Sequence, residues 1–511
     1  MNSYRKILFQ HLDGIVLLPT IVALNKIGLL QIIKNKKKFT IEELVSSRKI
    51  FPGYLNISLR ILRCSNLLDF IDKKDEFKNI YSTNHNFDKI LNNIKEIDKI
   101  SSILPYHTDF IILKEKEQKK FISILKDLDI LLSKRDKSFA SNFYNNLEGI
   151  IIGPIIANLA FYGKMKLDKN KLNIIDLDSK LYEIIINLFI KVNFLTKSNN
   201  VTKKGSYFFK RASSYGVTVS YLNTLMNIPE LLLSNPNYIW ERNTQNHEIH
   251  VNRSMNVWGS GGSHKTYFRK IDTIIFDIFN QDIEKQPIGI IDIGCGDGSF
   301  LKHVYTIIVT NTKRKDYIET HPIILIGTDI NKKAQDSTKK NLEGIKSIVI
   351  DGDISNPLQI DTILNTKYNL RLKDFVNCRT FLDHNRIYSQ PTKKLDHKIY
   401  SKGSFSFKGQ IISSKDLIDN FIIHICKWKK FISKHGLIIV ELHTLDPEIT
   451  RKNSGNSLAC AYDGTHGFSD QYLIEYDIFK KCIEKAGIVI SNKNESLFPE
   501  NIPTVSINYI K

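Results

Sequence analysis

The sequence predicts a mostly helical first half and, in its second half, an α/β fold built on a parallel sheet. Residues 288–293 are an apolar, Ile-rich run of strand length, followed by a Gly-spaced turn and the start of a helical pattern. Two further apolar runs of strand length, 323–329 and 347–353, each end in an aspartate. The first half instead has long apolar stretches in a helical rhythm, interrupted by short turn and hairpin patterns.

The turn behind the first of these strands has the composition of a ligand site. Its alternating residues are Asp292, Gly294, Gly296 and Gly298. Glycines let the backbone approach a ligand, and the free N–H groups of the following helix point toward it. The turn lacks the third Gly-x-x-Gly spacing of dinucleotide sites and is too compact for a pyrophosphate. Asp329 is suited to holding two ribose hydroxyls, and Asp353 is placed to accept from an adenine amino group.

This order of glycines and acids resembles motif I of the class I S-adenosylmethionine-dependent methyltransferases and the strands that follow it. The resemblance covers residues 252–511. It implies a Rossmann-like, seven-stranded sheet with an antiparallel strand pair at its end, and S-adenosylmethionine as the cofactor. A helix is expected over residues 415–434, before strand five. The strand pair is expected at residues 488–491 and 504–509, after a further helix that ends at about residue 486.

Length and composition limit the class of protein. The chain has 511 residues, enough for about three domains, and 42% of its residues are hydrophobic. Six cysteines without a CxxC pair favour a reducing compartment and argue against a structural zinc site. We expect residues 14–24 to be a buried helix, and the protein to be cytoplasmic without a membrane anchor. The predicted domains are residues 1–100, 101–250 and 251–511.

The first domain contains the elements of a winged helix. Thr40 and Glu43 have the spacing of a capping box at a helix start. A longer helix is expected over residues 54–68, and residues 69–83 have the pattern of a hairpin-like wing. In many small-molecule methyltransferases such a module forms a homodimer or covers the substrate. Winged helices also bind DNA, but helix 54–68 offers only two arginines, so we expect no specific nucleic-acid partner.

An internal sequence repeat predicts a second winged-helix-like unit. Residues 149–159 match residues 14–24 at the glycine, the first isoleucine, the proline, a later isoleucine and the last leucine. Residues 181–195 have the pattern of the helix before a wing, and residues 196–209 would form that second wing. We therefore expect two degenerate winged-helix units in tandem. The alternative is a chance similarity between two Ile-rich helices.

Three segments of the second half should contribute to the ligand site. Gly259 begins a Gly-Ser-Gly-Gly run that we expect to close over the methionine end of the cofactor; a flexible hinge is the alternative. Arg379, Asp383 and His384 follow strand four, and open α/β sheets bind ligands outside the carboxyl ends of their strands. Strand five, at residues 436–443, ends in Glu441 and His443.

Three sequence motifs indicate a smaller group within the class I methyltransferases. Residues 256–268, 379–386 and 461–472 are similar to those of methyltransferases embedded in certain bacterial polyketide synthases. The chain-initiating members of that group methylate carbon of a malonyl unit on an acyl carrier protein, with a bound iron or manganese ion. The resemblance therefore implies C-methylation of a polyketide-type acyl group held on a carrier protein.

Two kinds of catalysis fit these residues. Carbon methylation needs an enolate, which a divalent metal stabilises as a Lewis acid. His443, with His466 and Gln471 in the next loop, would supply the imidazole and oxygen ligands that suit iron or manganese, although hydrogen-bonded histidines without a metal are the alternative. His384, beside Asp383, is the other candidate base and would deprotonate the hydroxyl of a small molecule in an O-methyltransferase.

The net charge of +20 is spread thinly, which favours a solvated lysine-rich surface over a nucleic-acid site and would equally suit an acidic protein partner. Three hypotheses therefore stand. The first is a C-methyltransferase of a carrier-bound acyl substrate. The second is an O-methyltransferase of a diffusible metabolite, with the winged helices as dimer contact and lid. The third is a winged-helix regulator that binds DNA and senses the cofactor.

Overall fold

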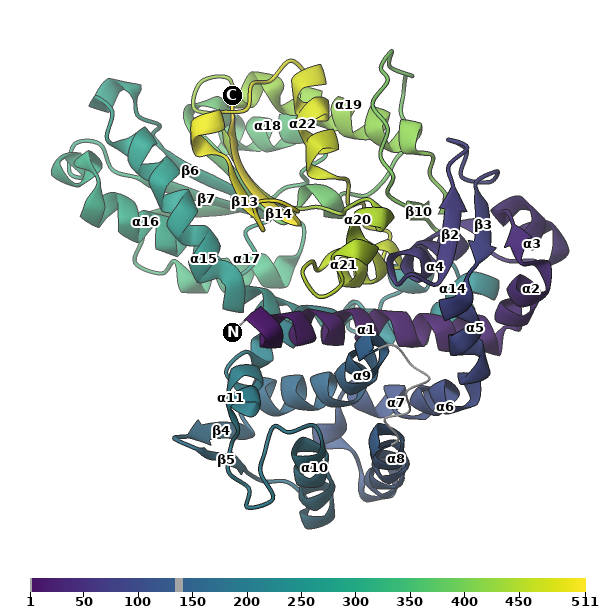
Figure 1. The fold of residues 1–511 in the computed structure, drawn as a ribbon. Helices are drawn as coiled ribbons and strands as arrows, with labels where there is room; N and C mark the ends of the chain where they lie inside the picture. Colours follow the sequence, from purple (N-terminus) through teal and green to yellow (C-terminus); the bar gives the residue numbers. More distant parts are fainter. Residues whose placement is uncertain (1, 134–140) are drawn as a thin grey trace. The chain divides into compact units, whose positions relative to one another are not determined.

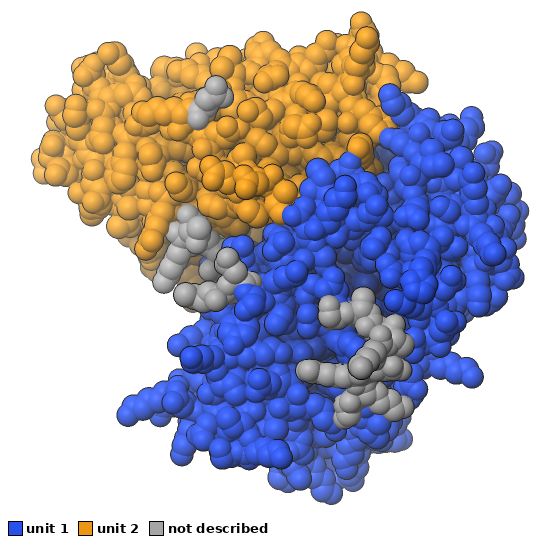
Figure 2. Space-filling view, viewed as in Figure 1, with its two compact units in different colours: residues 1–263, 404–413, 446–470 blue, residues 264–403, 414–445, 471–511 orange. Residues whose placement is uncertain are grey.

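The computed structural model describes residues 2–133 and 141–511 and divides the chain into two compact units. The first unit consists of residues 1–263 together with two later segments, 404–413 and 446–470 (Figure 2). The second unit consists of residues 264–403, 414–445 and 471–511. The sequence did not indicate that the two later segments belong with the N-terminal half.

The first unit begins with the predicted winged helix (Figure 1). The capping box is confirmed, because Thr40 Oγ1 accepts from the Glu43 N–H at 3.2 Å and Glu43 Oε2 accepts from the Thr40 N–H at 3.1 Å. The predicted wing is also confirmed, since three strands pair in the order β1-β3-β2. The elements are α1 (Asn2–Lys26), α2 (Leu29–Lys36), β1 (Lys38–Phe39), α3 (Ile41–Ser47), α4 (Pro52–Cys64), β2 (Leu68–Ile71) and β3 (Ile80–Thr83).

Within the first unit, a series of helices leads to the second winged-helix-like region. The predicted second wing is wrong in its second half, because residues Lys203–Phe209 form a helix that Thr202 caps by accepting from the Gly205 N–H at 3.0 Å. The part before it makes only isolated bridges, such as Leu195 with Val201. The elements are α5 (His85–Asn92), α6 (Ile94–Asp98), α7 (Leu104–His107), α8 (Glu115–Ser133), α9 (Ser141–Phe161), β4 (Met165–Asp168), β5 (Lys171–Ile174), α10 (Ser179–Lys191), α11 (Lys203–Phe209), α12 (Gly216–Ser220), α13 (Leu222–Met226), α14 (Ile228–Leu233) and α15 (Arg253–Phe279).

Helices α1 and α9, which contain the internal sequence repeat, cross at two glycines. A methyl group on Gly14 would lie 2.2 Å from the Asn146 carbonyl oxygen, and one on Gly149 would lie 2.3 Å from the His11 Cα. The two contacts are reciprocal, because Gly14 and Gly149 have the same separation along the chain as His11 and Asn146. This is the pattern of a two-fold symmetric interface within one chain. It supports the predicted tandem of related units.

Helix α1 is also the predicted buried helix. By length and composition its residues Ser3–Lys26 are the one span among the described residues that could cross a membrane, with a mean hydropathy of 1.8. However, 89% of that window is buried inside the structure. A core helix passes the same test of length and composition as a membrane span.

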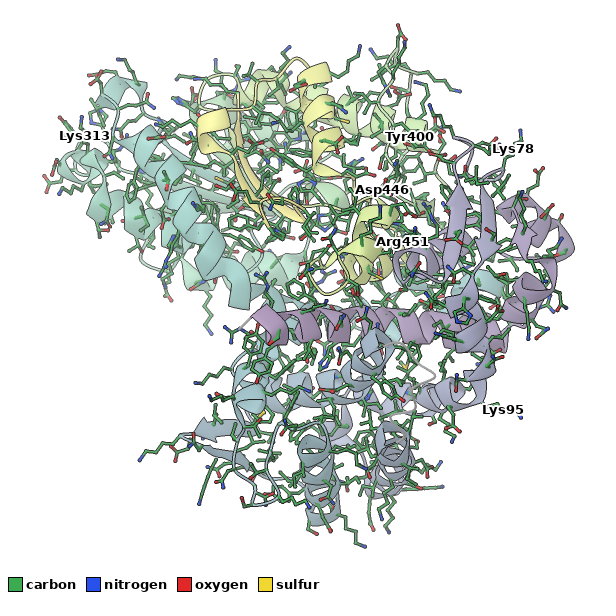
Figure 3. The ribbon with its side chains drawn as sticks, in the orientation of Figure 1. Lys78, Lys95, Lys313, Tyr400, Asp446 and Arg451 are labelled. Carbon is green, nitrogen blue, oxygen red and sulfur yellow. The ribbon has the colours of Figure 1, made fainter. Side chains whose placement is uncertain are left out.

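Residues 404–413 and 446–470 join the first unit through buried polar contacts. Asp470 is buried and accepts from the Lys408 N–H at 2.8 Å, from Trp240 Nε1 at 2.9 Å and from the Tyr54 hydroxyl at 3.1 Å. Arg451, which Figure 3 labels, also has its Nη1 3.3 Å from Asp69 Oδ1. The elements of these segments are β10 (Ser406–Phe407), β11 (Gln410–Ile411), α20 (Pro447–Lys452) and α21 (Ala459–Gly467).

The loop that we expected after strand five, with His466 and Gln471 in it, is wrong in its first part. Helix α21 extends to Gly467 and contains His466. Two contacts fix this helix on the first unit. Arg60 and Asp463 form a buried ion pair at 2.8 Å, and Gly464 lets the helix approach Val16 of α1 so closely that a methyl group would lie 1.9 Å from it. Residue-by-residue patterns gave no sign of either contact.

The second unit contains the predicted seven-stranded sheet, in the order β13-β14-β12-β9-β6-β7-β8. Strand β14 runs antiparallel to both of its neighbours, and the other pairs are parallel. This is the class I methyltransferase fold. The elements are β6 (Gly289–Ile293), α16 (Ser299–Asn311), β7 (Ile324–Asp329), α17 (Lys332–Asn341), β8 (Ser347–Asp351), α18 (Pro357–Tyr368), β9 (Val376–Thr380), α19 (Ser414–Ile432), β12 (Leu437–Leu442), α22 (Tyr476–Lys485), β13 (Ser496–Phe498) and β14 (Val505–Ile510).

The expected terminal pair is confirmed in part. Val489 and Lys511 exchange two N–H···O bonds of 3.0 Å, and Ile490 bridges antiparallel to Ile510 at the end of β14. The longer ladder beside β14 is instead made by Ser496–Phe498. The shorter connection explains the difference, since segments that are adjacent in sequence tend to pair when a short reversal joins them.

The α1–α9 crossing gives the first prediction. Gly14→Ala and Gly149→Ala should each lower the free energy of unfolding by about 1–3 kcal/mol, because the added methyl group overlaps the backbone of the facing helix. Thermal or urea unfolding of each variant measures the effect. Gly261→Ala is the matched control on α15, since a methyl group there meets no described atom within 4 Å. If all three variants are equally stable, the two glycines do not set this crossing.

Candidate functional site

The Gly-rich turn after β6 has the backbone that its glycines predict. Gly294, Gly296 and Gly298 have φ angles of 76°, 57° and 78°, in the left-handed region that favours glycine. A methyl group on Gly294 would contact Leu382 at 2.9 Å, so this glycine allows the close approach of the segment after β9. A methyl group on Gly296 would meet no described atom within 4 Å. Gly296 therefore borders open space at the carboxyl edge of the sheet.

The predicted acids lie along the same edge. Asp329 ends β7 and is bonded to the turn, because the Gly296 N–H donates to its Oδ2 at 3.2 Å. Asp353 follows β8 and is exposed, with one oxygen accepting from the Ser355 N–H at 2.8 Å. The next residue after Asp329 is Ile330, which is 68% exposed and offers an apolar surface for a planar base. These residues together fit the ribose and adenine of S-adenosylmethionine.

Asp292 lies inside this edge, at 1% exposure, and its Oδ1 has no hydrogen-bond partner among the described residues. Burial raises its pKa well above the usual range, and the negative charges of Asp329 and Asp297 add to the effect. A buried carboxyl with an unmet oxygen is costly unless a ligand or water satisfies it. Asp292 is therefore suited to a cationic or hydrogen-bond-donating part of a ligand.

A histidine–carboxylate pair lies beside the turn. His384 follows β9 in the short turn Asp383–Asn385, directly after the Leu382 that touches Gly294. Its Nδ1 lies 2.5 Å from Glu441 Oε1, and its backbone N–H donates to Glu441 Oε2 at 3.1 Å. Both side chains are buried. A carboxylate on Nδ1 fixes the tautomer and orientation of an imidazole, so that Nε2 takes up the proton.

Glu441 is the functional residue that the sequence left unassigned. It was noted as an acid at the end of strand five, but only the pairing of β12 beside β9 brings it to His384. The signal available in the sequence was the position of the acid itself, since side chains at the carboxyl ends of adjacent parallel strands converge.

Asp383 and Arg379 have different surroundings from those expected. Asp383 Oδ1 accepts from Arg379 Nη1 at 2.6 Å and from His424 Nε2 at 3.0 Å, and all three side chains are buried. Burial opposes ionisation, yet Arg379 and His424 outweigh it and hold the pKa of Asp383 well below its usual range. Asp383 is therefore a poor proton acceptor. Arg379 has its guanidinium 4.1 Å from the Trp428 ring and no exposed surface, so it packs against α19 instead of lining the strand edge.

Among the candidate metal ligands, His443 does not fit that role in its observed contacts. His443 and Gln471 belong to the second unit, and His466 belongs to the first. Both nitrogens of His443 are within hydrogen-bond distance of the protein, Nδ1 at 3.1 Å from Ile474 O and Nε2 at 2.7 Å from Ser506 Oγ. Burial lowers the pKa of His443 to about 3, so the ring is neutral. Across residues 2–133 and 141–511, no group of three or more His, Cys, Asp or Glu side chains could hold a metal ion.

Gly259 lies within α15, so the Gly-Ser-Gly-Gly run is helical and not the flexible hinge that was its alternative. A methyl group on Gly259 would lie 2.5 Å from the Val217 backbone nitrogen, which shows that this glycine allows α15 to approach α12. That packing contact is a reason for glycine independent of any cofactor. A cofactor role for Gly259 stays a prediction, and the side chains of residues 262–266 lie outside the described residues.

Comparison with protein families matches three parts of the chain. Residues 248–509, just over half of the chain, match a methyltransferase family described as AprA MT2-like domain. Residues 4–70 match the AprA N-terminal domain, and residues 148–235 match the AprA winged helix domain. No curated protein matches the chain.

Solved structures are similar at low identity. An O-methyltransferase family protein from Burkholderia thailandensis has a TM-score of 0.38 and 9% identity, over 65% of this chain and 84% of that chain. The CurJ carbon methyltransferase has a TM-score of 0.32 and 10% identity, over 83% and 98%. The mitomycin 7-O-methyltransferase MmcR has a TM-score of 0.31 and 9% identity, over 97% and 94%. These likenesses are too weak to indicate an acceptor for this chain.

The second prediction concerns the carboxyl edge of the sheet, where Gly296 and Asp329 lie. Asp329→Ala should weaken binding of S-adenosylmethionine by about 1.5–3 kcal/mol, the contribution of a hydrogen bond to a charged group. Gly296→Val should also weaken it, because the branched side chain would enter the open space and the positive φ does not suit valine. Isothermal titration calorimetry measures both.

The matched control is Asp336→Ala, which removes an exposed carboxylate from the adjacent helix α17 and should leave the affinity unchanged. Wild-type affinity in both Asp329→Ala and Gly296→Val would contradict the assignment of this edge to the cofactor.

Proposed function

We propose that this chain, which belongs to the AprA MT2-like family of methyltransferase domains, transfers a methyl group from S-adenosylmethionine to an acceptor whose proton His384 removes. The observation that carries the proposal is the buried His384–Glu441 pair beside the Gly-rich turn. The pair supports the proposal because Leu382, which touches Gly294, lies two residues before His384 in the same unit.

The residues of the second unit divide the work as follows. Gly296 and Asp329 bind and orient the nucleoside, while Asp292 meets a polar part of the same ligand. S-adenosylmethionine supplies an electrophilic methyl group on a sulfonium, which an aligned nucleophile takes by in-line displacement. His384 Nε2 accepts the proton of the nucleophile, and Glu441 stabilises the imidazolium that results.

For the acceptor, we propose carbon of a polyketide-type acyl group held on a carrier protein. The motif strings at residues 256–268, 379–386 and 461–472 support it. A hydroxyl of a small secondary metabolite is the second candidate, and the His384–Glu441 pair favours it, because a histidine base suffices to ionise a hydroxyl during transfer. The proposal assigns no step to iron or manganese, since His443 does not fit as a ligand in this arrangement.

DNA regulation is the weakest of the three hypotheses. Every residue of α4, the helix in the recognition position, is buried. Its two arginines are already engaged, Arg60 with Asp463 at 2.8 Å and Arg63 over the Phe70 ring at 3.4 Å. We therefore propose no specific nucleic-acid partner. A cytoplasmic location without a membrane anchor is a separate part of the proposal, which the burial of 89% of the apolar window in α1 supports. A homodimer is part of the same proposal, and sedimentation would measure it.

The third prediction tests the reaction. With methyl-labelled S-adenosylmethionine, the wild-type protein should label malonyl-loaded acyl carrier protein, and a panel of phenols and alcohols serves as the competing acceptors. His384→Gln should lower the rate by about 100-fold, the usual contribution of a general base. His321→Gln, at an exposed histidine of the same unit, is the control and should keep full activity.

Two outcomes would change the proposal. Label only on hydroxyl acceptors would select the O-methyltransferase, and no label on either class would contradict methyl transfer to these acceptors. A chelator added to the same assay tests the metal, and activity that needs added iron or manganese would contradict a base acting alone.

A further inference from the structure

Three side chains of α19, spaced four residues apart, face the segment of residues 379–386 that contains His384. Their partners on that segment follow in the opposite order along the chain. The pairs are Asn420 Oδ1 with Arg386 Nε at 2.9 Å, His424 Nε2 with Asp383 Oδ1 at 3.0 Å, and the Trp428 ring with Arg379 Cζ at 4.1 Å.

The residues that contact α19, namely Arg379, Asp383 and Arg386, lie on both sides of His384; they are called the anchors below. Asp383 directly precedes the histidine, and Arg386 follows it by two residues. The anchors are also joined to each other, because Asp383 Oδ1 accepts from Arg379 Nη1 at 2.6 Å and the Asp383 carbonyl accepts from Arg386 Nη1 at 2.8 Å. Asp383, Arg379 and Arg386 are 1%, 0% and 5% exposed. The turn that carries His384 is therefore held from α19, while Glu441 holds the ring from β12.

The charge states agree with these roles. Burial lowers the pKa of His424 to about 4, so its ring is neutral and donates one N–H to Asp383. Asp383 is ionised, as its contacts with Arg379 and His424 require. A neutral donor and a fixed anion hold position without competing for the proton that His384 receives.

We propose that α19 positions the base, and that His424 and Asn420 are positioning residues for methyl transfer. The inference rests on the proposed function, since it needs His384 to act as the base. Neither residue is assigned contact with the substrate. Their effect is on the geometry of His384, and a small displacement of a catalytic group costs a large factor in rate.

The test compares two substitutions at one site. His424→Leu removes the donor to Asp383, and kcat should fall about tenfold or more while the KM for S-adenosylmethionine stays within about twofold. His424→Gln keeps an N–H donor at a similar reach and should recover most of the lost kcat. Cys426→Ser, at an exposed residue of the same helix, is the control and should have wild-type kcat.

If His424→Leu does not fold, Asn420→Ala and Asn420→Asp give the same comparison, since only the aspartate keeps an acceptor for Arg386. Wild-type kcat in His424→Leu, or equal losses in His424→Leu and His424→Gln, would overturn the inference. A parallel rise in KM for S-adenosylmethionine would overturn it too, because that result indicates a general structural role. An inactive wild-type protein would instead contradict the proposed function.

Discussion

The arrangement of the site depends on the need to satisfy a carboxylate that the fold buries at the end of β12. Glu441 is 3% exposed, and its oxygens accept from the His384 N–H at 3.1 Å and from the Leu442 N–H at 2.6 Å, with the His384 ring at 2.5 Å. Leaving such a group without partners would cost several kcal/mol. The residues after β9 therefore turn back onto Glu441, which brings His384 to the edge where Gly296 and Asp329 lie.

The first unit is organised by a different constraint, the close crossing of α1 and α9. Reciprocal contacts at Gly14 and Gly149 make one chain resemble a symmetric dimer of two related halves. The later segment 446–470 then packs on α1, where Gly464 permits contact with Val16. Gly14 and Gly149 permit close backbone contact between the helices, whereas Gly464 makes room for the Val16 side chain.

Much of the fold follows from the sequence because its determinants are local. Each of these local features spans only a few residues, so its pattern predicts its structure: the Gly-rich turn, Asp329 at the end of β7, Asp353 after β8, and the Thr40 capping box. The seven-stranded sheet with its antiparallel end was predicted only through the family resemblance, since β14 pairs with β12 over a long distance in the chain.

The errors concern contacts between distant residues. Nothing near Asp463 in the sequence indicates that it pairs with Arg60, so residues 461–467 were expected to be a loop. The Gly259 run has the composition of a hinge, but its packing against Gly216 stabilises a helix. The role of Glu441 is a third example, because its partner lies more than fifty residues earlier in the chain.

The measurement that tests the central claim most directly is the single-turnover rate of methyl transfer in Glu441→Gln at saturating S-adenosylmethionine. Glutamine keeps the shape of the side chain but removes the charge that fixes the His384 tautomer and stabilises the imidazolium. We expect the rate to fall about 100-fold with cofactor affinity within a few-fold of wild type. A variant that transfers methyl groups at the wild-type rate would contradict the account of His384 and Glu441 as the proton-accepting pair.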